Sequence, residues 1–207
     1  MVAHLQRRLT HAARTRADIL EVATELAARG GLESLSLGRL AEAMAMSKAG
    51  VYAHFGSKEA LELAIVEAAF ETFVKEVAMP ASMAPVGLPR LEALFDGYFR
   101  YVVNRAEKGG CFFTAASMEF DDRTGPVRDK IAELTAARDG LIEAAIVEAK
   151  AKRQVKGVPK ELAISVLALA TGTAVIFQMK RDPSLFDATR KAMKRLLGVE
   201  MSASKQQ

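Results

Sequence analysis

The stretch SLGRLAEAMAMSKAGVYAHFGSKEAL, residues 36–61, constrains the fold of this chain more than any other. It contains two short runs of helix-forming residues on either side of a tight turn at residues 44–46. Ser36 precedes the first run and Ser47 precedes the second, and serine is a favoured N-cap because its hydroxyl accepts a backbone N–H. The spacing predicts two short helices, about 37–44 and from 48 onward, joined as a helix-turn-helix.

The rest of the chain is also predicted to be helical. Half of its 207 residues are apolar, only six Pro and fourteen Gly interrupt them, and no run of alternating β-branched residues indicates a strand. A first helix is expected to begin at a capping box formed by Thr15 and Asp18 and to end at Gly30 and Gly31. We therefore expect an all-α protein of about nine helices, with an N-terminal three-helix unit that contains the helix-turn-helix and a larger helical region after it.

The second helix of the pair carries small, polar and aromatic side chains where a free-standing surface helix would carry charge. In a DNA-binding helix-turn-helix, the first residues of this helix meet base edges, and groups near both helix N-termini hold phosphates. Ser47, Lys48, Ala49 and Gly50 are therefore expected to face a DNA groove, which the two small residues allow the backbone to approach closely.

The remaining residues of the second helix divide between core and surface. Val51 and Phe55 are expected to point into the small core, whereas Tyr52 and His54 can donate hydrogen bonds to phosphate oxygens and Lys58 can anchor the flank. The alternative for Tyr52 and His54 is that they only cover the core.

Basic residues also precede the first helix. Arg7, Arg8, Arg14 and Arg16 stand among the first sixteen residues without an acid, although the net charge of the whole chain is only +4. This basic N-terminal arm either lies along a phosphate backbone or is a solvated, frayed terminus.

Residues 14–65 resemble the DNA-binding domain of TetR/AcrR-type transcriptional regulators, through TRADILEVATELAARGG followed by residues 36–61. The resemblance implies a homodimer, and it implies that Tyr52 and Lys58 most often contact phosphates. It places at DNA-contacting positions Ser36, Ser47, Lys48, Gly50, Tyr52, His54 and Lys58.

The sequence departs from the family pattern at three positions. Leu35 stands where threonine is common, Ala53 stands where a larger aromatic or polar residue is frequent, and Ala45 replaces the usual turn glycine. If position 45 needs a positive φ, alanine costs about 1 kcal/mol relative to glycine.

Residues 58–78 are predicted to form one long helix with two apolar faces, which would contact the DNA-binding unit and a second helical domain and so act as a lever between them. Aromatic residues are concentrated in and after this helix. They are either ordinary core or the lining of an apolar ligand pocket, the use that regulators of the resembled family make of this region. The candidate pocket residues are Phe70, Phe73, Phe95, Tyr98, Phe99, Val102, Phe112, Phe113, Met118 and Phe177.

The last two predicted helices are residues 160–180 and 183–197. The first is apolar nearly all round and is expected to be buried by protein on all sides rather than to span a membrane. The small residues Ala168, Gly172 and Ala174 permit close helix contact. In the resembled family two such helices from each protomer form a four-helix dimer interface. Residues 201–207 are expected to be disordered.

Other features limit the location and the chemistry of the protein. The single cysteine, Cys111, and the lack of a secretory signal pattern indicate the cytoplasm. No catalytic residue, metal site or cofactor is predicted, because there is no Gly-rich phosphate loop and the adjacent Asp121 and Asp122 have no histidine partner.

Together these patterns predict a homodimeric transcriptional repressor that binds double-stranded DNA at a palindromic operator and is released by a small hydrophobic effector. The expected domains are a DNA-binding domain, residues 1–57, and a ligand-binding and dimerisation domain, residues 58–207. Two alternatives remain open: a transcriptional activator of the same fold, and a helical interaction protein without specific DNA binding.

Overall fold

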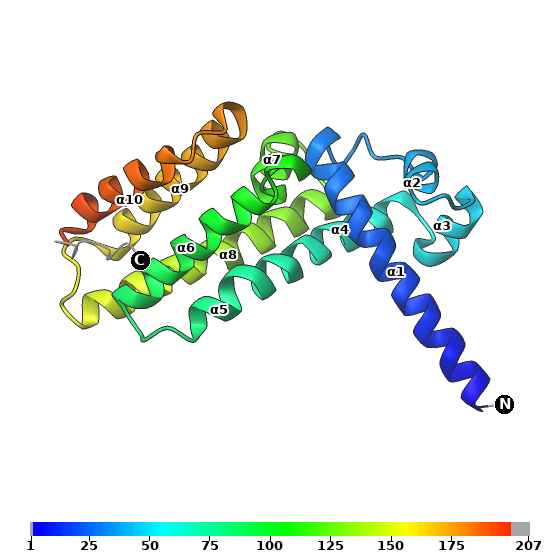
Figure 1. Cartoon of the computed structure of the whole chain (residues 1–207), viewed down its shortest axis with the longest axis horizontal. Coiled ribbons are helices and arrows are strands. Elements are labelled where there is room, and N and C mark those ends of the chain that lie inside the picture. The colour runs from blue at the N-terminus through cyan, green and yellow to red at the C-terminus, as the bar shows by residue number, and fades with distance from the viewer. Residues whose placement is uncertain (1, 200–207) are drawn as a thin grey trace. The chain divides into compact units, whose positions relative to one another are not determined.

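The computed structural model describes the backbone of residues 2–199 and the side chains of residues 11–199. Every regular element among these residues is helical, which confirms the predicted all-α class (Figure 1). The elements are α1 (Val2–Gly30), α2 (Leu37–Ala43), α3 (Lys48–Phe55), α4 (Lys58–Phe73), the π-helical turn η1 (Val74–Ala78), α5 (Met79–Ser82), α6 (Leu88–Asn104), the 3-10 turn η2 (Ala106–Lys108), α7 (Phe112–Glu119), α8 (Pro126–Ala151), α9 (Pro159–Lys180) and α10 (Ser184–Leu197). Because α4, η1 and α5 follow one another without a break, the ten α-helices of residues 2–199 form nine continuous stretches.

The chain divides into two compact units. The first contains the residues up to Thr72 together with Glu107–Leu134, and the second contains Phe73–Ala106 and the residues from Thr135 onward. The start of α8 therefore belongs to the first unit and the rest of that helix to the second. The functional domains predicted above remain a prediction, since these units group residues by contact and not by function.

The first helix differs from its predicted form. It was expected to begin at a capping box at Thr15, but α1 begins at Val2 and the Thr15 hydroxyl donates to the carbonyl oxygen of His11, 3.0 Å away. The residues before Thr15 include no Gly or Pro and are rich in Ala, Leu and Arg, so nothing stops the helix from extending through them. The predicted phosphate contacts of Arg7 and Arg8 and the predicted disorder of residues 201–207 lie outside the described side chains and backbone.

The core of the first unit forms where α1, α2 and α3 meet. Ile19, Leu40 and Val51 have no exposed surface, and each comes from a different one of these helices. Phe55 was expected to join them, but it is only half-buried, and the Arg16 guanidinium covers part of its ring at 5.0 Å from the centroid. This cation–π contact ties α3 to α1 at the surface of the unit.

Both predicted serine caps are present. The Ser36 hydroxyl accepts the N–H of Arg39 at 3.2 Å, and the Ser47 hydroxyl accepts the N–H of Gly50 at 3.0 Å. Between these caps the chain reverses at Ala45, whose φ is +51°.

The turn at Ala45 closes α2 with two hydrogen bonds. The N–H of Met46 donates to the carbonyl of Ala41 at 2.9 Å, and the N–H of Ala45 donates to the carbonyl of Glu42 at 3.1 Å. This pair of bonds is a Schellman motif, which places the residue after the C-cap in the left-handed conformation. Position 45 therefore does need a positive φ, and this is the case in which alanine was expected to be less stable there than glycine.

The second unit is built around α6, η1, the later part of α8, and the helix pair α9 and α10. Gly97 in α6 allows close approach to η1, because a Cβ at this position would lie 3.2 Å from Cγ1 of Val77. The helices α9 and α10 lie side by side (Figure 1) and are joined by a buried hydroxyl pair, Thr173 and Thr189, at 2.6 Å. Phe177 and Phe186 meet beside it with their ring centroids 4.7 Å apart.

Within its own chain α9 is buried on one side only, so the predicted burial by protein on all sides is not reached by these contacts alone. Ile164, Ile176 and Met179 are 61%, 44% and 83% exposed, respectively. They lie on one side of the helix, while Val166, Ala170 and Phe177 are buried. An all-round apolar sequence cannot show which side the same chain covers. By length and composition α9 could also cross a membrane, a criterion that the core helix of a soluble protein meets equally.

Replacing Ala45 by glycine is expected to raise the free energy of unfolding by about 1 kcal/mol, because glycine adopts a positive φ without the steric cost of a Cβ. Denaturant unfolding at one protein concentration measures this difference. The control is Ala132→Gly, at an exposed interior position of α8, which should lower the unfolding free energy by roughly 0.5–1 kcal/mol. A loss of stability in Ala45→Gly would contradict the strain inferred at the turn.

Glu92 in α6 supports a prediction about pH. Burial of this carboxyl, and next the nearby charge of Asp96, raise the pKa of Glu92 above its usual value of 4.5, and Lys194 opposes the shift. The fold thus favours the neutral carboxyl, and the stability gained from it is complete below pH 4.5 and is lost as the pH rises through the raised pKa.

The variant Glu92→Gln, which stays neutral, should therefore unfold at a higher urea concentration than the wild type at pH 7, with the two converging near about pH 4. The exposed Glu143→Gln in α8 is the matched control and should not change the midpoint. Equal midpoints of Glu92→Gln and wild type at pH 7 would refute the assigned effect of burial.

Candidate nucleic-acid interface and effector pocket

The start of α3 is an open surface beside the α2–α3 turn. Lys48 and Ala49 are exposed in the first turn of this helix, directly after the Ser47 cap. Gly50 is half-buried, and a Cβ there would lie 3.2 Å from the Ser47 hydroxyl oxygen. A glycine at position 50 therefore leaves room for the Ser47 hydroxyl, and it also lets another molecule come close to the backbone of α3.

The polar aromatic residues of α3 have different environments. Tyr52 is 52% exposed and so does not serve mainly to cover the core. His54 is half-buried, with its ring 6.3 Å from the ring of Phe55. Arg14 and Arg16 are exposed on α1, and Arg16 stacks on Phe55 as described above. The exposed side chains at this surface thus carry one tyrosine hydroxyl and several positive charges.

Lys58, at the first position of α4, is already hydrogen-bonded within the unit. Its ammonium donates to the carbonyl oxygen of Glu33 at 2.6 Å and pairs with Oε1 of Glu62 at 3.3 Å. A lysine ammonium has three N–H donors, so these two acceptors leave one donor for a further acceptor. The side chain of Lys58 is 47% exposed, which keeps that donor within reach of solvent or an anion.

Sequence reasoning missed two features at the start of α4. The hydroxyl of Ser57 caps the helix by accepting the N–H of Ala60 at 3.0 Å, a cap that the serine before a helix-forming run could have indicated. The Lys58 to Glu33 bond joins residues far apart in sequence, and no local pattern indicates such a contact.

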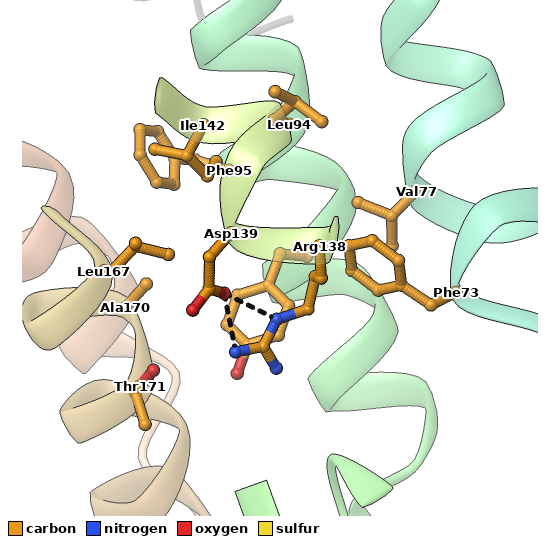
Figure 2. Close-up of a pocket in the computed structure, with 11 residues that line it drawn as sticks. Phe73, Val77, Leu94, Phe95, Arg138, Asp139, Ile142, Leu167, Ala170 and Thr171 are labelled. Atoms are coloured by element: carbon orange, nitrogen blue, oxygen red, sulfur yellow. Dashed lines mark hydrogen bonds and ion pairs between the residues drawn. The ribbon is translucent and has the colours of Figure 1, made fainter. Parts of the chain in front are cut away.

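A pocket lies within the second unit, with a volume of about 400 Å³ including its part open to solvent. Figure 2 shows apolar side chains of η1, α6, α8 and α9 around it, with Arg138 and Asp139 in the middle of the view. The lining residues are Phe73, Val77, Leu94, Phe95, Tyr98, Arg138, Asp139, Ile142, Leu167, Ala170 and Thr171.

Three of the ten predicted pocket residues, Phe73, Phe95 and Tyr98, line this pocket, and the other seven do not. In the second unit, Phe99 and Phe177 both pack against Phe186, with ring centroids 4.9 and 4.7 Å from it, and Val102 is buried. The four in the first unit are placed differently: Phe113 meets the rings of Phe70 and Phe112, and Met118 is 61% exposed. Helical spacing identifies apolar faces but cannot tell core from pocket.

The polar residues of the pocket were missed. Arg138 donates from Nε and Nη2 to Oδ1 of Asp139, at 2.9 and 2.8 Å, and only 13% of the Arg138 side chain is exposed. In the sequence this pair looks like ordinary charged surface of a helix. Thr171 adds a hydroxyl on the opposite helix (Figure 2).

The residue types do not point to a metal centre. Among the described side chains, no three His, Cys, Asp or Glu residues are grouped so that they could hold a metal ion. Asp121 and Asp122 are both exposed after α7.

Known structures share this fold. A TetR-family transcriptional regulator from Chloroflexus aurantiacus J-10-FL superimposes with a TM-score of 0.80 at 19% identity, over 91% of this chain and 96% of that chain. A TetR-family regulator from Cytophaga hutchinsonii gives 0.76 at 21% identity, over 93% and 98%. AibR, solved in complex with isovaleryl coenzyme A and operator DNA, gives 0.73 at 24% identity, over 89% and 100%. A search of curated protein sequences finds no significant match.

Two family models match the sequence itself. Residues 19–65 match the bacterial regulatory proteins of the tetR family. Residues 87–193 match the tetracyclin repressor-like C-terminal domain. The matched segments contain the capped α2–α3 pair and most of the pocket lining, and together they cover well over half of the chain. The protein belongs to the TetR family of transcriptional regulators, whose members bind DNA.

Proposed function

We propose that the protein is a homodimeric repressor that binds a palindromic operator through α3 and releases it when a small, mainly apolar effector enters the pocket of the second unit. The observation that carries the proposal is the open start of α3, where the Ser47 cap, Lys48 and Ala49 lie beside the exposed Tyr52. A helix N-terminus attracts phosphate and presents its first side chains to base edges.

In this proposal the DNA contacts come from α3 and from the starts of α2 and α4. Lys48, Ala49 and Gly50 read bases, while the Ser36 and Ser47 hydroxyls, Tyr52, His54 and Lys58 hold phosphates. The two α3 helices of a dimer must sit roughly 34 Å apart to enter successive major grooves of the operator. Residues 1–57 are then the DNA-binding domain and residues 58–207 the effector-binding and dimerisation domain.

The pocket supports the effector part of the proposal. Its lining is mainly apolar, so it favours an apolar molecule, and Arg138, Asp139 and Thr171 supply partners for one polar group. AibR, whose fold is similar, binds both an acyl coenzyme A and operator DNA, which supports the presence of both kinds of site on one such chain. A regulator of this kind acts in the cytoplasm and needs no catalytic residues.

A gel-shift titration with the DNA upstream of its own gene, at several salt concentrations, tests the proposal. A specific complex should survive salt that removes non-specific binding. Equal affinity for every DNA sequence would instead favour the helical interaction protein. A reporter gene behind the bound operator separates repression from activation.

The two kinds of DNA contact are distinguished by variants in α3. Tyr52→Ala is expected to weaken binding to every operator variant by a similar factor, because a phosphate contact carries no base information. Lys48→Ala is expected to reduce discrimination at one base position by about 1–3 kcal/mol. Fluorescence anisotropy with a set of single-base operator variants measures both effects.

Lys152→Ala, which removes an equal charge from the second unit, is the control for Lys48→Ala and should leave discrimination unchanged. The phosphate role of Tyr52 is wrong if Tyr52→Ala binds the operator as tightly as the wild type does.

The exposed side of α9 supports the homodimer. Ile164, Ala168, Ile176 and Met179 are exposed along one stripe, and a Cβ at Gly172 on this stripe would meet nothing within 4 Å. On α10, Leu196 is 38% exposed. A second copy that covers these faces of α9 and α10 would bury apolar surface and complete a four-helix interface.

Ile164→Glu is therefore expected to convert the dimer to a monomer, because it places a charge within an apolar contact. Sedimentation velocity should show a halved mass at micromolar concentration, and operator affinity should fall with it. Met83→Glu, which adds the same charge at a side chain that is 86% exposed outside α9 and α10, is the control and should remain dimeric. A dimeric Ile164→Glu protein would place the interface elsewhere.

A further inference from the structure

Glu33, in the loop between α1 and α2, is bonded through all three of its polar groups. Its N–H donates to Oε1 of Glu119 at 3.0 Å, its carbonyl oxygen accepts from Lys58 Nζ at 2.6 Å, and its carboxylate pairs with the guanidinium of Arg123. These partners come from the end of α7, the start of α4 and the α7–α8 connection, all within the first unit. One loop residue thus connects three other segments.

Glu119 acts on the backbone of this loop at two places. Besides the N–H of Glu33, its carboxylate accepts the N–H of Leu32 at 2.7 Å. Gly31 makes room for it: the φ of this residue is +92°, and a Cβ would lie 2.7 Å from Oε1 of Glu119. A charged acceptor bonded to two adjacent backbone amides holds a loop more firmly than a neutral acceptor does.

Arg123 is itself held in place. Its Nε donates to the carbonyl oxygen of Glu119 at 2.8 Å, and its guanidinium lies 5.0 Å from the ring centroid of Phe120. The hydrogen bond from Arg123 lowers the pKa of the Glu33 carboxyl, and the same bond raises the pKa of Arg123. Both side chains therefore keep their charges over a wide pH range, and the pair persists.

The same segment also contacts the end of α1. Lys108 pairs with Glu25, Arg29 donates to the carbonyl oxygen of Glu107, and a Cβ at Gly109 would lie 2.5 Å from the backbone of Ala28. Figure 1 shows α7 beside this end of α1. Residues 107–123 thus contact α1 and the loop that follows it. These contacts hold in place the segment that carries Glu119 and Arg123.

We propose that Glu119 and Arg123 are positioning residues for DNA binding: they hold Glu33, and the carbonyl of Glu33 holds the Lys58 ammonium so that its remaining donor is directed at an operator phosphate. This inference rests on the proposed DNA-binding function. A lysine side chain loses considerable rotamer entropy when it binds an anion, and Lys58 has already lost much of it through Glu33 and Glu62. Release of the loop would restore that freedom, and the ammonium would then no longer be held at the phosphate, so that the contact and its counterion release would be lost from the DNA complex.

The test is a double-mutant cycle on the affinity for the protein's own operator, measured by fluorescence anisotropy over a range of salt concentrations. Lys58→Ala should weaken binding roughly tenfold near 0.1 M salt and reduce the slope of log affinity against log salt by about 0.9, the value for one phosphate contact. Glu119→Ala should reproduce most of both effects. The double variant should bind about as well as Lys58→Ala alone, since both changes remove the same contact.

Two further variants separate positioning from stability. Arg123→Gln removes the ion pair with Glu33 and the other Arg123 contacts but leaves in place the bonds of the Glu119 carboxylate to the loop amides, so it should give a smaller change of the same kind. Glu133→Ala removes an exposed carboxylate of the same unit that pairs with Lys130, and should change neither affinity nor slope. Circular dichroism confirms that each variant is folded, and if Glu119→Ala is not, Glu119→Gln and Arg123→Gln replace it in the cycle.

Each outcome has a definite meaning. A weaker affinity with an unchanged salt slope, or additive effects of Glu119→Ala and Lys58→Ala, would show that Glu119 only stabilises the fold, and would overturn the proposal. An operator affinity unaffected by Lys58→Ala would overturn it as well. If the wild type binds no operator specifically, the proposed function fails. If the wild type binds and Tyr52→Ala weakens it while Glu119→Ala does not, only this inference fails.

Discussion

The helix proposed to read DNA is too short to be stable by itself. With eight residues α3 falls below the roughly 12–15 residues at which isolated helices become even marginal in water. Its conformation therefore depends on the burial of Val51 against α1 and α2, on the Ser47 cap, and on the left-handed turn at Ala45. The strained alanine is tolerated because the two hydrogen bonds of the Schellman motif and the core on either side of it fix the turn.

The same dependence extends to the loop before α2. Two of its backbone amides find their acceptor in Glu119, on a helix 87 and 86 residues further along the chain. The first unit is therefore not complete at the end of α3 or even α4, and it needs residues 107–134 to satisfy its polar groups. A segment matched by the C-terminal family model thus contributes structurally to the unit that contains the helix-turn-helix.

The sequence was sufficient for features that depend on neighbouring residues. The two serine caps, the burial of Val51, and the positive φ considered for Ala45 all follow from patterns within a few residues. It was insufficient where distant segments decide the outcome. Phe73, Phe95, Phe99 and Phe177 all lie on apolar faces of helices, and the sequence does not distinguish them. In the structure Phe186 packs on Phe99 and Phe177, whereas Phe73 and Phe95 line a pocket. The exposed side of α9 likewise could not be predicted, because the helix carries apolar residues on nearly all of its sides. Only the helices that pack against it in the fold distinguish one side from another.

The long helix predicted to transmit the effector signal contains a π-helical turn where it reaches the pocket. The N–H of Met79 donates to the carbonyl of Val74, five residues earlier, and Phe73 and Val77 at this turn line the pocket. A π-helical turn inside an α-helix is rare and is found frequently at functional sites. An occupant that pressed on Val77 would meet resistance from α6, because Gly97 allows α6 to pack directly against this residue. In the proposed function, the response to an effector should therefore involve η1 and α6 together.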